Sequence, residues 1–174
     1  MSRTGRFRYV GDTALRRPPP ADMVVVRSRA ALEAWLATRD RTEIFEPFTY
    51  VVDLTGLLRL APRRSEHVAA AEGDEVLAAG EVTFGRDDSG RDGGGWSVTE
   101  ISNHSSGYCP DLDCWEAVAI ALDRVRVARP RSFTNPVVFR RCPVCDERNI
   151  VRDDDYVCAL CDARLPRQWN FDED

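Results

Sequence analysis

Alternating and clustered apolar residues predict a series of short strands. The segment 23–26 is apolar throughout, and 48–54 is rich in the β-branched and aromatic residues that strands favour. A Thr-Gly pair separates 48–54 from the apolar segment 57–60, which is typical of a β-hairpin. The segments 76–84 and 96–102 follow the same pattern, so we expect them to form a second antiparallel pair.

Two other segments carry apolar residues at helical spacing. The first helix is expected to start after Ser28, which can cap it, and to run to about Arg39. The second is expected from Trp115 to about Ala128, with Asp113 as its cap. Their core faces comprise Leu32, Trp35 and Leu36 in the first helix, and Val118, Ala121, Leu122 and Val125 in the second. Because hairpins predominate, we predict an α+β fold with a mostly antiparallel sheet and two helices.

Four cysteines near the C-terminal end have the spacing of a zinc site. The pairs Cys142/Cys145 and Cys158/Cys161 are two CxxC knuckles separated by twelve residues. Zinc prefers four tetrahedral ligands, and two knuckles supply four thiolates. The spacing therefore predicts a small zinc ribbon holding one structural Zn²⁺.

The residues around the knuckles refine this prediction. Short strands are expected at 149–151 and 156–157, joined by the turn 153–155. Asp146 and Asp162 each follow the second cysteine of a knuckle, where we expect left-handed backbone. A ribbon of this size buries little core, so its folding depends on the metal.

These elements divide the chain into three expected parts. Residues 1–22 form a basic, proline-rich arm that is either mobile or extended along the body, 23–139 form the α+β domain, and 140–174 form the zinc ribbon. The loop 85–95 holds five glycines but no phosphate-binding fingerprint. We therefore interpret it as a flexible hairpin tip.

Composition adds constraints on compartment and partners. All 24 basic residues are arginine, which fits either a GC-rich genome or selection against a modifiable lysine near a conjugating enzyme. The net charge of −5 argues against a general nucleic-acid coat. No apolar run is long enough for a membrane span or a signal peptide, so with its CxxC pairs the chain is expected in a reducing cytoplasm without membrane contact.

The two histidines lie in polar segments that could carry chemistry. His104, Cys109 and Cys114 follow one another at a spacing of five residues, so together with His67 they could form a second zinc site. A nucleophilic pairing of Cys109 with either histidine is a second interpretation. The third is that the two cysteines are partly buried thiols and the histidines make local hydrogen bonds.

Residues 48–128 also resemble a known domain. The segments that carry the likeness are 65–69, 76–81 and 105–110, the last of them before a helix. They resemble a domain of plant IQ-motif calmodulin-binding proteins, of which similar segments occur in bacterial toxin-like proteins. In that family a His-Ser-Ser segment precedes an Ala-Ala-Gly hairpin, and a Ser-Gly-His-Tyr-x-Pro segment precedes a helix. The matching residues are Ser65, Ala79, Gly80, Tyr108 and Pro110.

The two histidines of that family pattern do not match. They fall here on Arg64 and Gly107, although His67 and His104 stand nearby. Neither an IQ motif nor a calmodulin-binding helix is visible. The resemblance therefore implies a fold more than a reaction.

Three functions are consistent with these features. The first is a non-enzymatic binding or adaptor protein with a protein partner, as part of a bacterial regulatory or defence assembly. The second is nucleic-acid binding through an arginine run just before the knuckles, which comprises Arg124, Arg126, Arg129, Arg131, Arg140 and Arg141. The third is a toxin-like enzyme, whose candidate catalytic residues are Ser65, Glu66, His67, His104 and Tyr108.

Overall fold

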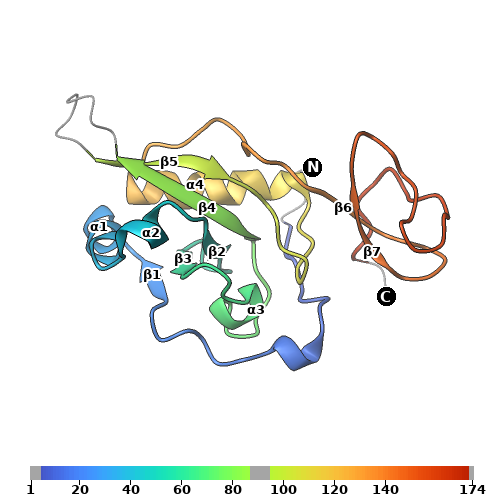
Figure 1. Cartoon of the computed structure of the whole chain (residues 1–174), viewed down its shortest axis with the longest axis horizontal. Coiled ribbons are helices and arrows are strands. Elements are labelled where there is room, and N and C mark those ends of the chain that lie inside the picture. Colours follow the sequence, from blue (N-terminus) through green and yellow to red (C-terminus); the bar gives the residue numbers. More distant parts are fainter. Residues whose placement is uncertain (1–4, 87–94, 173–174) are drawn as a thin grey trace.

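The body of the protein is a five-stranded antiparallel sheet. A computed structural model describes residues 5–86 and 95–172 and is shown in Figure 1. The strand order is β1-β3-β2-β4-β5, and all neighbouring pairs are antiparallel. The strands are β1 (Val24–Val26), β2 (Phe48–Val52), β3 (Leu58–Ala61), β4 (Ala78–Arg86) and β5 (Trp96–Ile101). This sheet confirms the predicted α+β class.

Two main helices accompany the sheet, as predicted. Ser28 caps the first by accepting a hydrogen bond from the N–H of Ala31 at 3.2 Å. The second contacts three of the strands, β2, β3 and β4. The helices are α1 (Arg29–Ala37), α2 (Arg41–Ile44), α3 (His67–Ala70) and α4 (Trp115–Val125), with short 3-10 turns η1 (Thr13–Leu15) and η2 (Leu112–Cys114).

The start of α4 differs from the prediction that Asp113 caps it. The side chain of Asp111 accepts a hydrogen bond from the N–H of Leu112 and so caps η2, which leads directly into α4. Cys114 is the N-cap residue of α4 and makes no side-chain capping bond. The prediction was wrong because the extra 3-10 turn moves the capping position two residues earlier in the chain.

The centre of the sheet and the N-terminal segment share one core. All five residues of β2 are buried, and α3 and α4 both contact this strand. Phe7 is 2% exposed and exchanges two backbone hydrogen bonds with Val76, just before β4. The described part of the basic arm therefore lies along the body, which Figure 1 shows as the blue trace beneath the sheet.

The C-terminal part is built on a separate two-stranded sheet. Its strands are β6 (Val138–Arg141) and β7 (Arg148–Val151), which pair antiparallel across the first knuckle. The strand expected at 156–157 is not formed, and β7 pairs with β6. Arg152 and Asp155 make an isolated bridge across the expected turn, and Val157 makes one with Arg164.

Among the described residues, no helix is both long and apolar enough to cross a membrane. Most of the glycine-rich segment, residues 87–94, lies outside the described part of the chain.

Candidate metal centre

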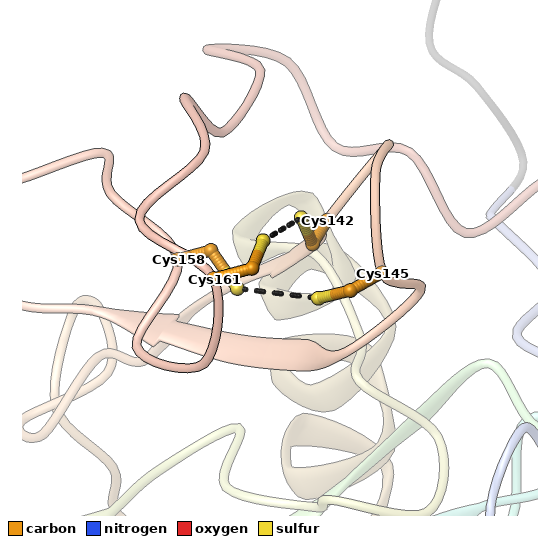
Figure 2. Close-up of side chains that lie close together, drawn as sticks. All are labelled: Cys142, Cys145, Cys158 and Cys161. Carbon is orange, nitrogen blue, oxygen red and sulfur yellow. Dashed lines mark hydrogen bonds between the residues drawn. The ribbon is translucent and has the colours of Figure 1, made fainter.

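The four knuckle cysteines converge on one point. Their sulfur atoms all lie within 4.8 Å of one another. Figure 2 shows the four side chains gathered together. The Sγ atoms of Cys142 and Cys161 are 3.6 Å apart, as are those of Cys145 and Cys158. Four sulfurs around a zinc ion at 2.3 Å would be separated by about 3.8 Å, so the cluster fits one tetrahedral ion. The same separations are far too long for disulfide bonds.

Backbone N–H groups stabilise the thiolate form of the first cysteine in each knuckle. The N–H of Val144 donates to Cys142 Sγ, and the N–H of Leu160 donates to Cys158 Sγ, both at 3.4 Å. Burial opposes ionisation of Cys158, but the hydrogen bonds outweigh it and lower its pKa to about 6. Hydrogen bonds from the N–H groups of Cys145 and Val144 likewise lower the pKa of Cys142. Both sulfurs are thus prepared to bind a cation.

The backbone after each knuckle has the expected left-handed conformation. Asp146 has φ = 65° and Asp162 has φ = 59°. Their N–H groups donate to the carbonyl oxygens of Cys142 and Cys158 at 3.0 Å, which closes each knuckle into a tight turn. This prediction is confirmed.

Asn149 of β7 supports the second knuckle and was missed in the sequence. Its side chain is buried and donates to Cys158 Sγ at 3.5 Å and to the Glu147 carbonyl at 2.9 Å. Its Oδ1 accepts from the N–H of Ala159 at 2.9 Å. In the sequence Asn149 is an ordinary residue of a strand, and only the fold places it beside the second knuckle.

The second zinc site considered above is not formed by the described residues. Among them, the only cluster of three or more metal-binding side chains is the four-cysteine one. Cys109 is buried beside Phe139 and Phe171, and Cys114 is buried in the main core. Burial raises the pKa of Cys109 to about 12, so its thiol is protonated at neutral pH and is a poor nucleophile.

Both histidines lie near Glu81, a residue that sequence reasoning did not select. The Nδ1 atom of His104 is 3.9 Å from a Glu81 carboxylate oxygen, and His67 bonds the Gly80 carbonyl through Nε2 at 2.9 Å. Interaction with Glu81 raises the pKa of His104, whereas burial lowers that of His67. The only feature of the sequence that could have pointed to Glu81 is its position directly after the Ala-Ala-Gly segment.

A shallow groove of about 170 Å³ runs past Glu81 and His104. Its polar lining includes Glu81, Glu100, Ser102 and His104. The other candidate catalytic residues do not line it. Tyr108 is buried and donates its hydroxyl to the Asp74 carbonyl at 2.7 Å.

Ser65 and Glu66 lie at the entry to α3. The carbonyl of Ser65 accepts a hydrogen bond from the Thr49 hydroxyl at 3.0 Å. Glu66 is the N-cap residue of α3, although its side chain makes no capping bond. Of the five candidate residues, only His104 therefore lines this groove.

Several arginines of the proposed nucleic-acid run bind other parts of this chain. Arg140 is 7% exposed and donates to the carbonyls of Phe139, Pro166 and Arg167. Arg129 forms a two-pronged ion pair with Asp123. The remaining contacts are those of Arg124 with the Thr55 and Gly56 carbonyls, and of Arg141 with Asp146 and the Phe171 ring.

Comparisons with known proteins give no family for this chain. No model of a known protein family, no curated protein and no solved structure matches it. The four-cysteine cluster and the α+β body are therefore interpreted from their own geometry.

Proposed function

We propose that the chain is a zinc-binding, non-enzymatic adaptor that docks another protein. The observation that carries this proposal is the four-sulfur cluster. Four cysteine ligands complete the tetrahedral shell of zinc and leave no open position for a substrate, which is the pattern of a structural site. The ion would therefore fix the shape of the ribbon, and a fixed shape suits recognition.

The groups outside the metal centre also favour a binding role. Of the candidate catalytic side chains only His104 lines the groove, and the resemblance of residues 48–128 to a known domain implies no reaction. Nucleic-acid binding is less favoured, because Arg124, Arg129, Arg140 and Arg141 hold partners in this chain. The charge of −5 points the same way.

Zinc content tests the first half of the proposal. We expect one zinc per chain in protein purified without added metal, and one in the Cys109→Ser/Cys114→Ser variant, because neither thiol belongs to the cluster. Cys142→Ser should contain none. Two zinc ions falling to one in the first variant would contradict this assignment and support a second site.

Partner recovery tests the second half. A complex isolated from the native host with the wild-type chain should be lost with Cys142→Ser and kept with Cys109→Ser/Cys114→Ser. A complex that survives removal of zinc would place the docking surface on the body and refute a ribbon-centred adaptor.

Catalysis in the groove is a second candidate, favoured by the His104–Glu81 pair. A carboxylate beside a half-exposed histidine is an arrangement used for general acid–base catalysis. His104→Ala should then abolish a biological effect of the chain without changing its unfolding temperature. Full retention of that effect would exclude this candidate.

A further inference from the structure

The metal centre faces solvent on one side only. The first cysteine of each knuckle is buried, with Cys142 1% and Cys158 0% exposed. The second cysteines are more open, since Cys145 is partly exposed and Cys161 is exposed. A bound ion would therefore lie nearest to solvent beside Cys145 and Cys161.

Two large apolar side chains accompany these open cysteines. Val144 immediately precedes Cys145 and is 74% exposed, and Leu160 immediately precedes Cys161 and is 67% exposed. Neither belongs to the apolar core of the ribbon. We call Val144, Leu160 and the two open cysteines the knuckle face.

Hydrogen bonds hold the backbone of the knuckle face in place before any partner arrives. The N–H groups of Val144 and Leu160 are both held by hydrogen bonds to the buried sulfurs Cys142 Sγ and Cys158 Sγ. A partner that covers these two side chains buries apolar surface and orders little backbone. Such preorganisation increases the affinity that a small contact can reach.

The charge around the knuckle face is negative. Four thiolates around a divalent ion leave a net negative charge, and acidic residues directly follow both open cysteines. Asp162 and Glu147 have no arginine partner among the described residues. Asp146, by contrast, lies with its Oδ1 3.6 Å from Nε of Arg141.

The arginines of the ribbon do little to offset this charge. Arg148 donates to the Ser106 carbonyl in the body, and Arg152 acts on the pKa of His104, so both lie toward the body. Arg140 is buried and Arg167 pairs with Asp154. The exception is Arg164, which is exposed two residues after Asp162.

We propose that the knuckle face docks a protein segment in which an apolar side chain is flanked by lysine or arginine. This inference rests on the proposed adaptor function and specifies its partner. An apolar anchor would cover Val144 and Leu160, and the flanking cations would meet Asp162 and Glu147. A second copy of this face would bring like charges together, and a phosphate backbone would be repelled.

The test uses the full zinc-loaded chain and three sets of immobilised short synthetic peptides. One set combines Leu or Phe with Lys and Arg, the second replaces the cations with Glu and Asp, and the third replaces the apolar residues with Ser and Gln. We expect the basic–apolar set to bind most tightly, with an affinity that falls as salt is raised.

Matched variants locate the contact. Val144→Ser/Leu160→Ser should weaken binding of the basic–apolar set by about tenfold or more while zinc content stays at one per chain. Glu147→Gln/Asp162→Asn should reduce the salt dependence. Ile120→Ser removes a similarly exposed side chain from α4 and should bind like wild type.

The outcomes separate this inference from the function on which it rests. Equal binding of the acidic–apolar set, or unchanged binding by Val144→Ser/Leu160→Ser with zinc retained, overturns the knuckle-face proposal alone. Tighter binding of a duplex DNA oligonucleotide than of any peptide also overturns it. Absence of zinc from the wild-type chain refutes the proposed function, and this inference with it.

Discussion

At the scale of single residues, the missing side chain of Gly80 lets β4 pass close to the backbone beyond β5. A Cβ atom built there would lie 2.0 Å from the Ser102 carbonyl oxygen, which also accepts the Tyr50 hydroxyl at 2.8 Å. Main chain and a buried tyrosine surround this oxygen, so no flexible side chain can move aside. Close approach, rather than a special backbone angle, requires glycine here.

We therefore predict that Gly80→Ala lowers the free energy of unfolding by about 3 kcal/mol, the cost of overpacking a rigid site. Gly85→Ala is the matched control on the same strand, because its Cβ would meet only the side chain of the exposed Thr99. Urea unfolding measures both. Equal losses for the two variants would show that general strand propensity, not the contact with Ser102, sets the cost.

The two histidines should titrate on opposite sides of their ordinary pKa of 6.5. The carboxylate of Glu81 raises the pKa of His104, and burial lowers that of His67. Below pH 6.5 His104 therefore adds stability that is lost as the pH rises through its folded pKa. His67 acts in the opposite sense, because its stabilising effect is present above pH 6.5 and is lost as the pH falls through its folded pKa.

NMR titration of the ring protons tests this pair. Glu81→Gln should lower the pKa of His104 toward 6.5, whereas Glu100→Gln, which changes a second carboxylate of the groove, should leave it close to the wild-type value. A His104 pKa that does not respond to Glu81→Gln would show that the 3.9 Å pair is not formed in solution.

At the scale of elements, the second knuckle depends on a residue of β7. Asn149 contacts Cys158 Sγ and the N–H of Ala159 at once. Such outer hydrogen bonds orient ligands and strengthen metal binding. We predict that Asn149→Ala weakens zinc retention by about tenfold in competition with a chelating dye. Ile150→Ala, on the neighbouring position of the same strand, should retain zinc like wild type.

Local signals predicted most elements, and contacts between distant segments decided the rest. The cap at Ser28 and the strands of the body depend on neighbours in sequence, and these predictions are confirmed. The error at 156–157 arose because a short β-forming pattern does not say which segment it pairs with, and β7 pairs with β6. Asp111, not Asp113, is the capping residue, because an added 3-10 turn cannot be predicted from the spacing of apolar residues.

The same distinction applies to the candidate site. CxxC spacing is a local pattern, so the four-cysteine cluster could be predicted from sequence. Glu81 and Asn149 are placed beside their partners only by the pairing of strands, and no local pattern marks them. The dispersal of Ser65 and Tyr108 away from the groove has the same cause.

At the scale of the whole molecule, Trp169 joins the ribbon to the body. Its ring packs edge-on against Phe7 with centroids 5.4 Å apart, and its indole N–H donates to the Cys109 carbonyl at 2.7 Å. It contacts both the main core and the smaller cluster around Phe139 and Phe171. Figure 1 shows the hairpin of β6 and β7 beside the body.

Trp169→Ala should lower the free energy of unfolding by about 3 kcal/mol. Trp169→Phe keeps an aromatic ring and should lose about 1 kcal/mol, the effect of leaving the Cys109 carbonyl without its donor. Zinc content should stay at one in both, since Trp169 lies outside the apolar core of the ribbon. Loss of zinc from Trp169→Ala would mean that the ribbon cannot hold metal without the body.

The left-handed aspartates have a consequence in evolutionary terms. Glycine at Asp146 and Asp162 would relieve backbone strain of about 1 kcal/mol at each position without touching a metal ligand. Homologues should therefore tolerate asparagine or glycine at these two positions, whereas a β-branched residue at either one would strain the knuckle turn.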